Sequence, residues 1–402
     1  MNRATLLRLL PILGITFIDI FGFSMLLPLL PFFVKHFGAA DVVVGWVAAT
    51  YSICQLIAGP LWGNLSDRIG RKAVLIVSQV GATIGWALLG FAPTIAWVFA
   101  SRAIEGLSGG NLGVTQAYIG DLVEPAQRGR AFALLGAAFS AGFVFGPALA
   151  GWLASAYGFS TPFFVAAGLQ ALTLVLTIVL LPDSRAGATE EAKNVATPRD
   201  IVVALADRRV APVLWLRLVF VLGMYGWFGA MALVLNRQLG WGVSDTSFVF
   251  AIFGVFQVVL QLTATGKTVD GMGNRAATNL AIAILAGAFA LISFATSLPL
   301  AIVFMILFGV GMSLANSAFP ALASGVAPED RRGTVLGVFS GLDSLAGFLM
   351  PPLVTGVLGA YGVRPAVAIV FGLLVTALAI GLAQSRTVTP RLVRVAESAA
   401  PK

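Results

Sequence analysis

Hydrophobic residues gather in long blocks along this chain, and short polar segments separate the blocks. Twelve such blocks lie at about 9–34, 43–65, 73–92, 95–119, 130–155, 162–182, 210–236, 246–266, 276–296, 299–325, 334–357 and 365–384. Each block has the length at which an α-helix crosses a hydrocarbon core about 30 Å thick. The pattern therefore predicts an all-α membrane protein with twelve transmembrane helices.

The two sides of the membrane that this pattern defines carry very different numbers of basic residues. If both termini are cytoplasmic, the cytoplasmic segments hold 20 of the 25 Lys and Arg residues. The opposite side holds Lys35, Arg237 and Arg364. Because cytoplasmic loops carry an excess of positive charge, we expect a multi-pass plasma-membrane protein with both termini in the cytoplasm.

Composition narrows the class further. The 402 residues are 58% hydrophobic and 10% charged, whereas about a quarter of a soluble domain is charged. The net charge of +8 is explained by the excess of basic residues in the cytoplasmic segments, so we expect no nucleic-acid partner. Cys54 and His36 are the only residues of their types, so we expect no disulfide and no metal site. No G-x-x-x-x-G-K-[ST] loop or hydrolytic triad occurs, and we expect neither a cofactor nor enzyme activity.

A polar stretch at 183–209 divides the hydrophobic blocks into two sets of six. We predict an N-terminal six-helix bundle at 1–182 and a cytoplasmic linker at 183–209, with a short surface helix near Asp200–Asp207. A second six-helix bundle is expected at 210–385, followed by a cytoplasmic tail at 386–402.

The two halves repeat each other. The pattern Gly63-x-x-x-Asp67-x-x-Gly70 recurs as Gly266-x-x-x-Asp270-x-x-Gly273, Arg128-Gly129 recurs as Arg332-Gly333, and Pro147 recurs as Pro351. The offsets of these matches are 203, 204 and 204 residues. The repeat predicts two pseudo-symmetric bundles with a substrate site at their interface near the membrane midplane, where rocking exposes it alternately.

The loop between the second and third blocks predicts a cytoplasmic gate. Its residues are Gly63, Asp67, Arg68, Gly70, Arg71 and Lys72, and the repeat adds Asp270. Glycines permit a tight reversal at the membrane surface, which a merely basic loop would not need. We expect Asp67 to cap the start of span eleven, near Arg332, when the protein is open to the outside.

This loop resembles the signature of the major facilitator superfamily, and three further patterns agree with the resemblance. They are Asp19-x-x-Gly22-x-x-x-x-x-Pro28-x-x-Pro31, Arg102-x-x-x-Gly106-x-x-Gly109 and Ser140-x-Gly142-x-x-x-Gly146-Pro147-x-x-x-Gly151. The chain is most similar to the twelve-span drug/proton antiporters, in particular the tetracycline/proton antiporters. It has Gly85 where those antiporters carry an acid and Gln257 where they carry a histidine, and it retains their Gln261.

Five charged residues lie within the predicted spans, where each is costly unless it meets a partner or water. Asp19, Arg102 and Glu105 are expected to couple transport to protons, although Arg102 and Glu105, at i and i+3, could equally form a purely structural ion pair. Arg217 and Asp343 are expected to form a structural pair. Small residues and a bend at Gly142, Gly146 and Pro147 predict close helix packing, with or without an antiport-specific role.

Polar and aromatic residues of the later spans predict a mostly apolar substrate cavity. The candidates are Gln116, Tyr225, Trp227, Phe228, Gln257, Gln261 and Asn316. Some of the aromatic residues could instead face lipid.

The sequence therefore predicts a monomeric secondary active transporter, with a small-molecule substrate, protons and the lipid bilayer as its partners. Proton-coupled efflux of small lipophilic or amphipathic molecules is the preferred interpretation. The alternatives are a proton-coupled or passive carrier of a physiological solute or a lipid-like amphiphile, and a membrane sensor that transports nothing.

Overall fold

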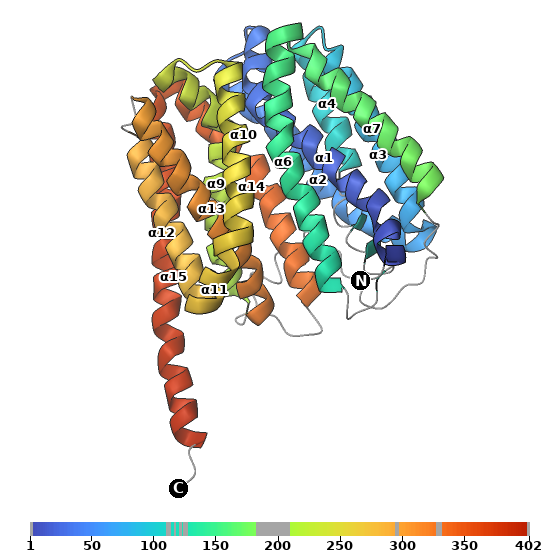
Figure 1. Cartoon of the computed structure of the whole chain (residues 1–402). Coiled ribbons are helices and arrows are strands. Elements are labelled where there is room, and N and C mark those ends of the chain that lie inside the picture. Colours follow the sequence, from blue (N-terminus) through green and yellow to red (C-terminus); the bar gives the residue numbers. More distant parts are fainter. Residues whose placement is uncertain are drawn as a thin grey trace.

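In the computed structural model of the chain, the described residues are 3–109, 114–115, 118–119, 123, 128–181, 210–293, 297–326 and 332–399. Within these ranges the regular structure is entirely helical. Long helices run side by side, and α1 begins on the same side of the molecule on which α15 ends (Figure 1). We call this the terminal side and the opposite one the distal side.

The helices fall into two series, one on each side of residues 182–209. The first series is α1 (Arg3–His36), α2 (Asp41–Ile69), α3 (Arg71–Gly90), α4 (Ile95–Ser108), α6 (Arg128–Tyr157) and α7 (Ser160–Leu180). The second is α9 (Ala211–Leu239), α10 (Val243–Leu260), a π-helical turn η3 (Gln261–Thr265), α11 (Gly266–Met272), α12 (Asn274–Ile292), α13 (Leu298–Val326), α14 (Arg332–Tyr361) and α15 (Val363–Ala399).

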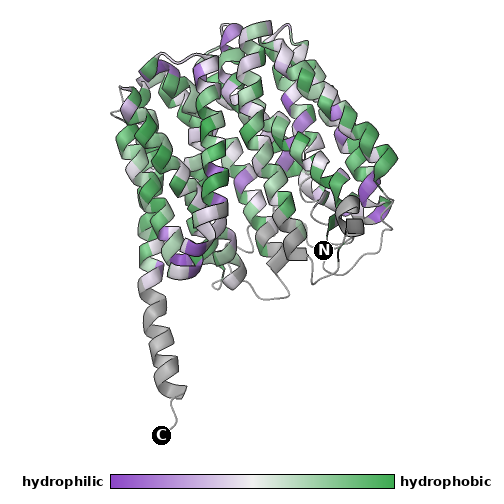
Figure 2. Ribbon diagram, in the orientation of Figure 1, coloured by the Kyte–Doolittle hydropathy of each residue, from purple (hydrophilic) through white to green (hydrophobic). Residues whose placement is uncertain are grey.

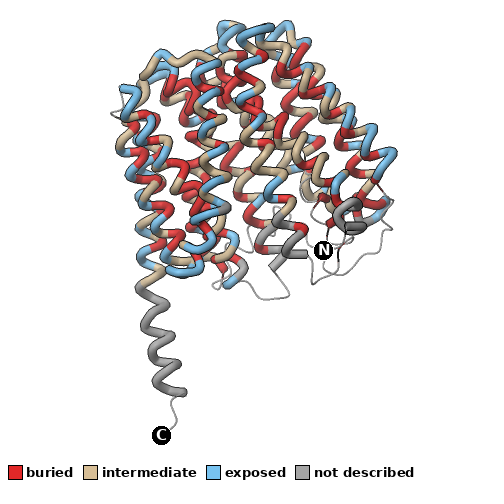
Figure 3. The backbone as a smooth tube through the Cα atoms, in the orientation of Figure 1, coloured by how far each residue is buried: buried red, intermediate tan, exposed pale blue. Residues whose placement is uncertain are grey.

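Eleven helical segments within the described residues are long and apolar enough to cross a membrane. They match eleven of the twelve predicted spans. The fourth predicted span, 95–119, is described only in part, because α4 ends at Ser108 and the next described residues are isolated. Hydrophobic residues predominate along these helices (Figure 2), buried positions concentrate between the helices (Figure 3), and many large hydrophobic side chains are exposed. This distribution suits a protein whose sides face lipid, and it confirms the predicted all-α membrane fold.

Some sequence-based predictions concern residues outside the described ranges, and one concerns the C-terminal segment. The predicted linker and its surface helix near Asp200–Asp207 lie outside the described residues, as does Gln116. Past the predicted end of the last span, α15 continues as one helix to Ala399, through most of the segment that was expected to be a tail.

The two halves have equivalent backbone turns, in agreement with the sequence repeat. Six glycines have positive φ among the described residues, and they form three equivalent pairs across the halves. The pairs are Gly38 and Gly240 (φ 72° and 70°), Gly70 and Gly273 (94° and 81°), and Gly158 and Gly362 (92° and 86°). Side chains other than hydrogen rarely tolerate this region, so the same sharp turns are specified at equivalent places in both halves.

Each half packs its helices in the same way. Helix α1 packs on α6 and α3 on α7, and correspondingly α9 packs on α14 and α12 on α15. The halves meet along two seams, α2 with α14 and α6 with α10.

Candidate functional site

The first buried polar contact joins α1 to α7. Asp19, half-buried in α1, accepts a hydrogen bond of 2.9 Å to its Oδ1 from Nε2 of Gln170. The Gln170 side chain comes from α7 and is 2% exposed. Sequence reasoning singled out Asp19 but missed Gln170, which lies 151 residues further along the chain.

Arg102 and Glu105 form an ion pair on one face of α4, as their spacing predicts. Both side chains are buried. The Arg102 guanidinium carbon lies 5.6 Å from the ring centroid of Tyr51 and 5.5 Å from that of Trp86. Such distances allow cation–π attraction, so the carboxylate and the two rings together hold this cation inside the protein.

The space beside Gly85 is filled by Glu105. A Cβ built on Gly85 would collide with Cγ of Glu105. Glu105 therefore fits against α3 only because residue 85 is a glycine. This contact places the carboxyl group of Glu105, from α4, beside Gly85 of α3.

Arg217 and Asp343 are joined across α9 and α14. Nη2 of Arg217 lies 2.8 Å from one carboxylate oxygen of Asp343 and 2.9 Å from the other. The guanidinium carbon also lies 5.3–5.8 Å from the ring centroids of three phenylalanines, Phe220, Phe319 and Phe339. The pair expected from the sequence is therefore present, within an aromatic shell.

The predicted cavity residues are not all found at one place. Trp227 is fully buried, with its ring centroid 5.0 Å from that of Phe289 and 5.3 Å from that of Phe304. Because those partners belong to α12 and α13, Trp227 packs inside the second half, and we assign it to the core rather than to a cavity. Phe228 is half-buried, with its ring 6.1 Å from that of Phe308.

Tyr225 and the polar candidates lie in more open positions. Tyr225 is half-buried near Gly347, where α9 approaches α2 and α14. Gln261 begins the π-helical turn, donates to Oγ of Ser317 at 2.8 Å and accepts from Ser313 at 3.2 Å. Gln257 is half-buried and Asn316 is exposed. Single π-turns are frequent at functional sites, which makes Gln261 the best supported of these candidates.

The predicted gate loop contains a sharp turn at Gly70, which immediately precedes α3 and has φ 94°. Arg71 is buried and hydrogen-bonds to Oγ of Ser66. The other basic residues are less enclosed, since Arg68 is exposed and Lys72 is half-buried, like Gly63. Asp270, the counterpart in the second half, is exposed, and the side chain of Asp67 lies outside the described residues.

Gly142 and Gly146 form the surface on which α1 packs. A Cβ on Gly142 would lie 2.8 Å from the backbone nitrogen of Phe21, and one on Gly146 would lie 2.6 Å from the backbone oxygen of Phe21. Oγ of Ser24 donates to the carbonyl oxygen of Gly142 at 2.9 Å. Pro147, one residue further along α6, is buried. Close approach of the two backbones therefore depends on these glycines.

On the distal side, a buried carboxylate connects the two halves. Asp41, the first residue of α2, is 4% exposed; its Oδ1 lies 2.9 Å from Nζ of Lys35, and its Oδ2 lies 2.5 Å from Nη2 of Arg237 in α9. Nη1 of Arg237 also donates to the backbone oxygen of Leu358 in α14. Sequence reasoning missed this cluster, although Lys35 and Arg237 are two of the three basic residues that the positive-inside pattern leaves on this side.

Close contacts continue from this cluster along both seams. A Cβ on Gly45 of α2 would collide with Pro351 and Thr355 of α14. Gly254 of α10 similarly has room for no side chain against Val144 of α6. The distal halves of the seams are thus packed with backbone close to backbone.

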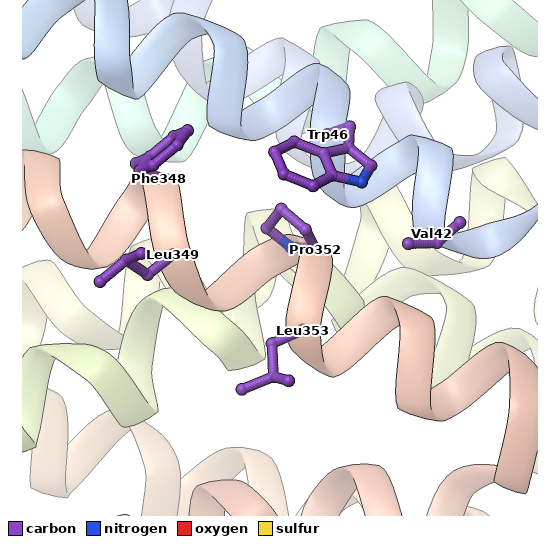
Figure 4. A pocket seen from close by; sticks show the side chains of 6 residues that line it. All are labelled: Val42, Trp46, Phe348, Leu349, Pro352 and Leu353. Carbon is purple, nitrogen blue, oxygen red and sulfur yellow. The ribbon is translucent and has the colours of Figure 1, made fainter.

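An apolar hollow of about 300 Å³ lies on the outer face of the α2–α14 seam (Figure 4). It is lined by Val42, Trp46, Phe348, Leu349, Pro352 and Leu353. The hollow contains none of the predicted cavity residues. Within the described residues, no group of three or more His, Cys, Asp or Glu side chains could hold a metal ion.

Comparison with known proteins defines the class of this chain. The Major Facilitator Superfamily profile matches residues 12–234 and 225–401. The chain therefore belongs to the Major Facilitator Superfamily, and it is a membrane transporter for a small-molecule substrate rather than an enzyme.

Particular relatives are similar over most of their length. The tetracycline resistance protein, class C, of Escherichia coli is 29% identical over 365 residues, covering 88% of this chain and 90% of the relative. Multidrug resistance protein 2 of Bacillus subtilis (strain 168) is 26% identical over 345 residues, covering 84% and 85%.

Solved structures show the same fold. A bacterial homolog of the human lysosomal transporter Spinster, in an inward-facing and unoccupied conformation, has a TM-score of 0.79 at 15% identity, covering 96% of this chain and 98% of that one. The human organic anion transporter MFSD10 (TETRAN) has a TM-score of 0.73 at 21% identity, covering 94% and 100%.

Proposed function

We propose that this protein exports small lipophilic or amphipathic molecules in exchange for protons, by alternating access between its two halves. The observation that carries the proposal is the contact of Asp19 with Gln170 within the first half. A carboxyl group at this depth is costly as an anion and is tolerated where it can exchange a proton or meet a partner. The tetracycline and multidrug resistance relatives favour drug-like substrates.

Asp19 would act as the coupling acid. It would take up a proton when the site is open to the outside and lose the proton to the cytoplasm. The ion pair of Arg102 with Glu105 supplies a second proton-accepting group in the same half. A cation favours the ionised form of a nearby carboxyl group, so a change in how Arg102 divides its charge between Glu105 and Asp19 would change the proton affinity of Asp19.

Topology and domain roles belong to the same proposal. The terminal side would face the cytoplasm, which gives two cytoplasmic termini in the plasma membrane. The bundles at 1–182 and 210–385 would rock about the linker at 183–209, and the protein would act as a monomer. In this assignment the present structure is closed on the outside, because the contacts of Asp41 with Arg237 and of Gly45 with Pro351 lie on the distal side.

Transport into inside-out vesicles tests the proposal. Tetracycline and ethidium would be the probes, with an imposed pH gradient as the only driving force. Asp19→Asn should abolish accumulation of the transported probe but leave its gradient-free exchange intact, because the neutral amide resembles a permanently protonated acid. Asp245→Asn is a matched control, since Asp245 is an acid that accepts from the backbone N–H of Gly242 at the distal end of α10.

Each outcome separates the alternatives. Accumulation by Asp19→Asn under a pH gradient alone would remove Asp19 from the coupling role. Equilibration that the pH gradient does not affect in the wild-type protein would favour the passive-carrier alternative. Absence of any flux of either probe would contradict drug export and would favour a physiological solute as substrate.

A further inference from the structure

The contact between Asp19 and Gln170 is unusual for a helix crossing in lipid. Gln170 is 2% exposed, so its amide is almost completely removed from solvent. A buried amide without a partner costs free energy, and here the amide hydrogen meets Oδ1 of Asp19 at 2.9 Å. Thr173 and Thr177, which follow Gln170 in α7, are also buried and polar. Their hydroxyl groups, however, donate to backbone oxygens of α7 itself. The side chain of Gln170, in contrast, hydrogen-bonds to a different helix.

The second half of the molecule has an equivalent crossing, of α9 with α15, in which the corresponding positions are apolar. The buried positions of α7 recur in α15 at an offset of 204: residues 163, 166, 170, 173 and 177 correspond to 367, 370, 374, 377 and 381, all of them buried. This is the same offset that relates Gly158 to Gly362. The counterpart of Gln170 is therefore Leu374, which is fully buried.

The counterpart of Asp19 is also apolar. Gly38 and Gly240, which follow α1 and α9, are related by an offset of 202. At that offset the buried residues 21, 22, 24 and 25 of α1 correspond to 223, 224, 226 and 227 of α9, which are buried as well. Asp19 then corresponds to Val221, which is 2% exposed. The equivalent positions of the second half thus carry Val and Leu where the first half carries Asp and Gln.

This comparison separates a structural role from a functional one. Because α9 packs on α15 with apolar residues at the equivalent positions, the fold does not require a polar pair at this place in the α1–α7 crossing. A glutamine amide suits a group that changes protonation state: its N–H₂ donates to a carboxylate, and its oxygen can accept from a carboxylic acid after rotation of the amide.

We propose that Gln170 is the positioning residue of the proton-coupling acid, holding the Asp19 carboxyl group in one orientation in both of its protonation states. This inference rests on the proposed function, in which Asp19 carries the coupled proton. Gln170 acts only through Asp19. It stabilises the ionised form by a charge-assisted hydrogen bond, and such bonds are stronger than neutral ones.

Other ionisable groups share the neighbourhood and set the background for any pH effect. Tyr51 of α2 interacts electrostatically with both Asp19 and Arg102. Arg102 and its partner Glu105 belong to α4. Within the described residues, α7 carries no charged side chain, α9 contributes Arg217 and Arg237, and the charged residues of α6 and α10 lie at or near the ends of those helices. A change confined to Gln170 leaves all of these charges in place.

The test measures protonation of Asp19 directly and needs no known substrate. The carboxylic-acid C=O infrared band of the reconstituted full chain is titrated with pH, and the spectrum of Asp19→Asn is subtracted to isolate Asp19. In Gln170→Leu the pH midpoint of this band should move by about one unit to higher pH, the effect of losing one charge-assisted hydrogen bond. Gln170→Met, with an unbranched side chain of similar length, should give the same shift.

Matched controls separate the role of Gln170 from the role of Asp19 if the measured midpoints differ from those expected. Thr177→Val removes a buried hydroxyl of the same helix and should leave the midpoint unchanged. Both Gln170 variants should unfold at the wild-type temperature, because Leu374 packs at the equivalent place. A midpoint that is unchanged in Gln170→Leu and Gln170→Met would overturn the role of Gln170 while leaving Asp19 as the coupling acid. A wild-type protein without a titrating Asp19 band would contradict the coupling acid itself, and with it this inference.

Discussion

At the scale of single residues, four of the five charges within the predicted spans occur in two ion pairs. Arg102 is paired with Glu105 along one helix, and Arg217 is paired with Asp343 across two helices. Aromatic rings surround both cations. Aromatic faces attract cations and exclude water, so each pair is held in an environment in which losing one partner is costly.

The pair of Arg217 and Asp343 makes a prediction about stability. Either Arg217→Gln or Asp343→Asn should destabilise the protein by about 1–3 kcal/mol, because a charge is left without its partner in a partly exposed site. The double variant should be more stable than either single variant, since it leaves no lone charge. Thermal unfolding of the purified protein in detergent measures all three. A double variant no more stable than the singles would show that the pair is not the source of the effect.

At the scale of elements, the α1–α6 crossing depends on the absence of side chains. The backbone oxygen of Phe21 would lie 2.6 Å from a Cβ on Gly146, and helices in lipid associate through this kind of close packing. Other glycines of α6 have no such constraint: a Cβ on Gly136 would meet nothing within 4 Å.

These two glycines provide a matched pair of substitutions. Gly146→Ala should destabilise the protein by about 1–3 kcal/mol, because the added methyl group must push α1 away from α6. Gly136→Ala should be neutral or slightly stabilising, because alanine is the better helix former. Thermal unfolding in the same detergent compares them. Equal unfolding temperatures for the two variants would contradict the importance of close packing at this crossing.

At the scale of the whole molecule, the distal parts of the two seams keep the halves together. Asp41 binds Arg237 across the halves, and Arg237 binds the end of α14 through the oxygen of Leu358. In the proposed alternating access, these contacts would break in each cycle. The distal end of the α2–α14 seam is therefore the place to arrest the cycle.

A disulfide at this seam should stop transport reversibly. A Cβ on Gly356 would lie 3.8 Å from Cβ of Val42, which matches the mean Cβ–Cβ distance of a disulfide. The variant Val42→Cys with Gly356→Cys, in a Cys54→Ser background, should lose transport of the probe on oxidation and regain it on reduction. Each single cysteine variant serves as a control. Full transport by the cross-linked protein would show that this seam does not open.

Much of the architecture could be predicted from the sequence because membranes impose simple local rules. A chain in lipid must satisfy its backbone polar groups internally, so hydrophobic blocks of sufficient length become helices, as α1, α9 and α13 did. Repeated glycines are equally local, because the positive φ of Gly70 and Gly273 is a property of one residue and its turn. These features required no knowledge of which helices touch.

Apart from the two ion pairs that the sequence predicted, Arg102 with Glu105 and Arg217 with Asp343, only the tertiary structure decided which polar side chains meet. The partners Asp19 and Gln170 are 151 residues apart, and Asp41 and Arg237 are 196 apart. Helices that are apolar on all sides carry no stripe that says which face is turned inward, so the sequence placed Trp227 in a cavity, whereas packing placed it in the core. The sequence by itself determined the spans, the repeat and the charges that need partners, because these depend on residue type and spacing. The partners themselves depend on the rotation and contact of each helix, which only the packed structure determines.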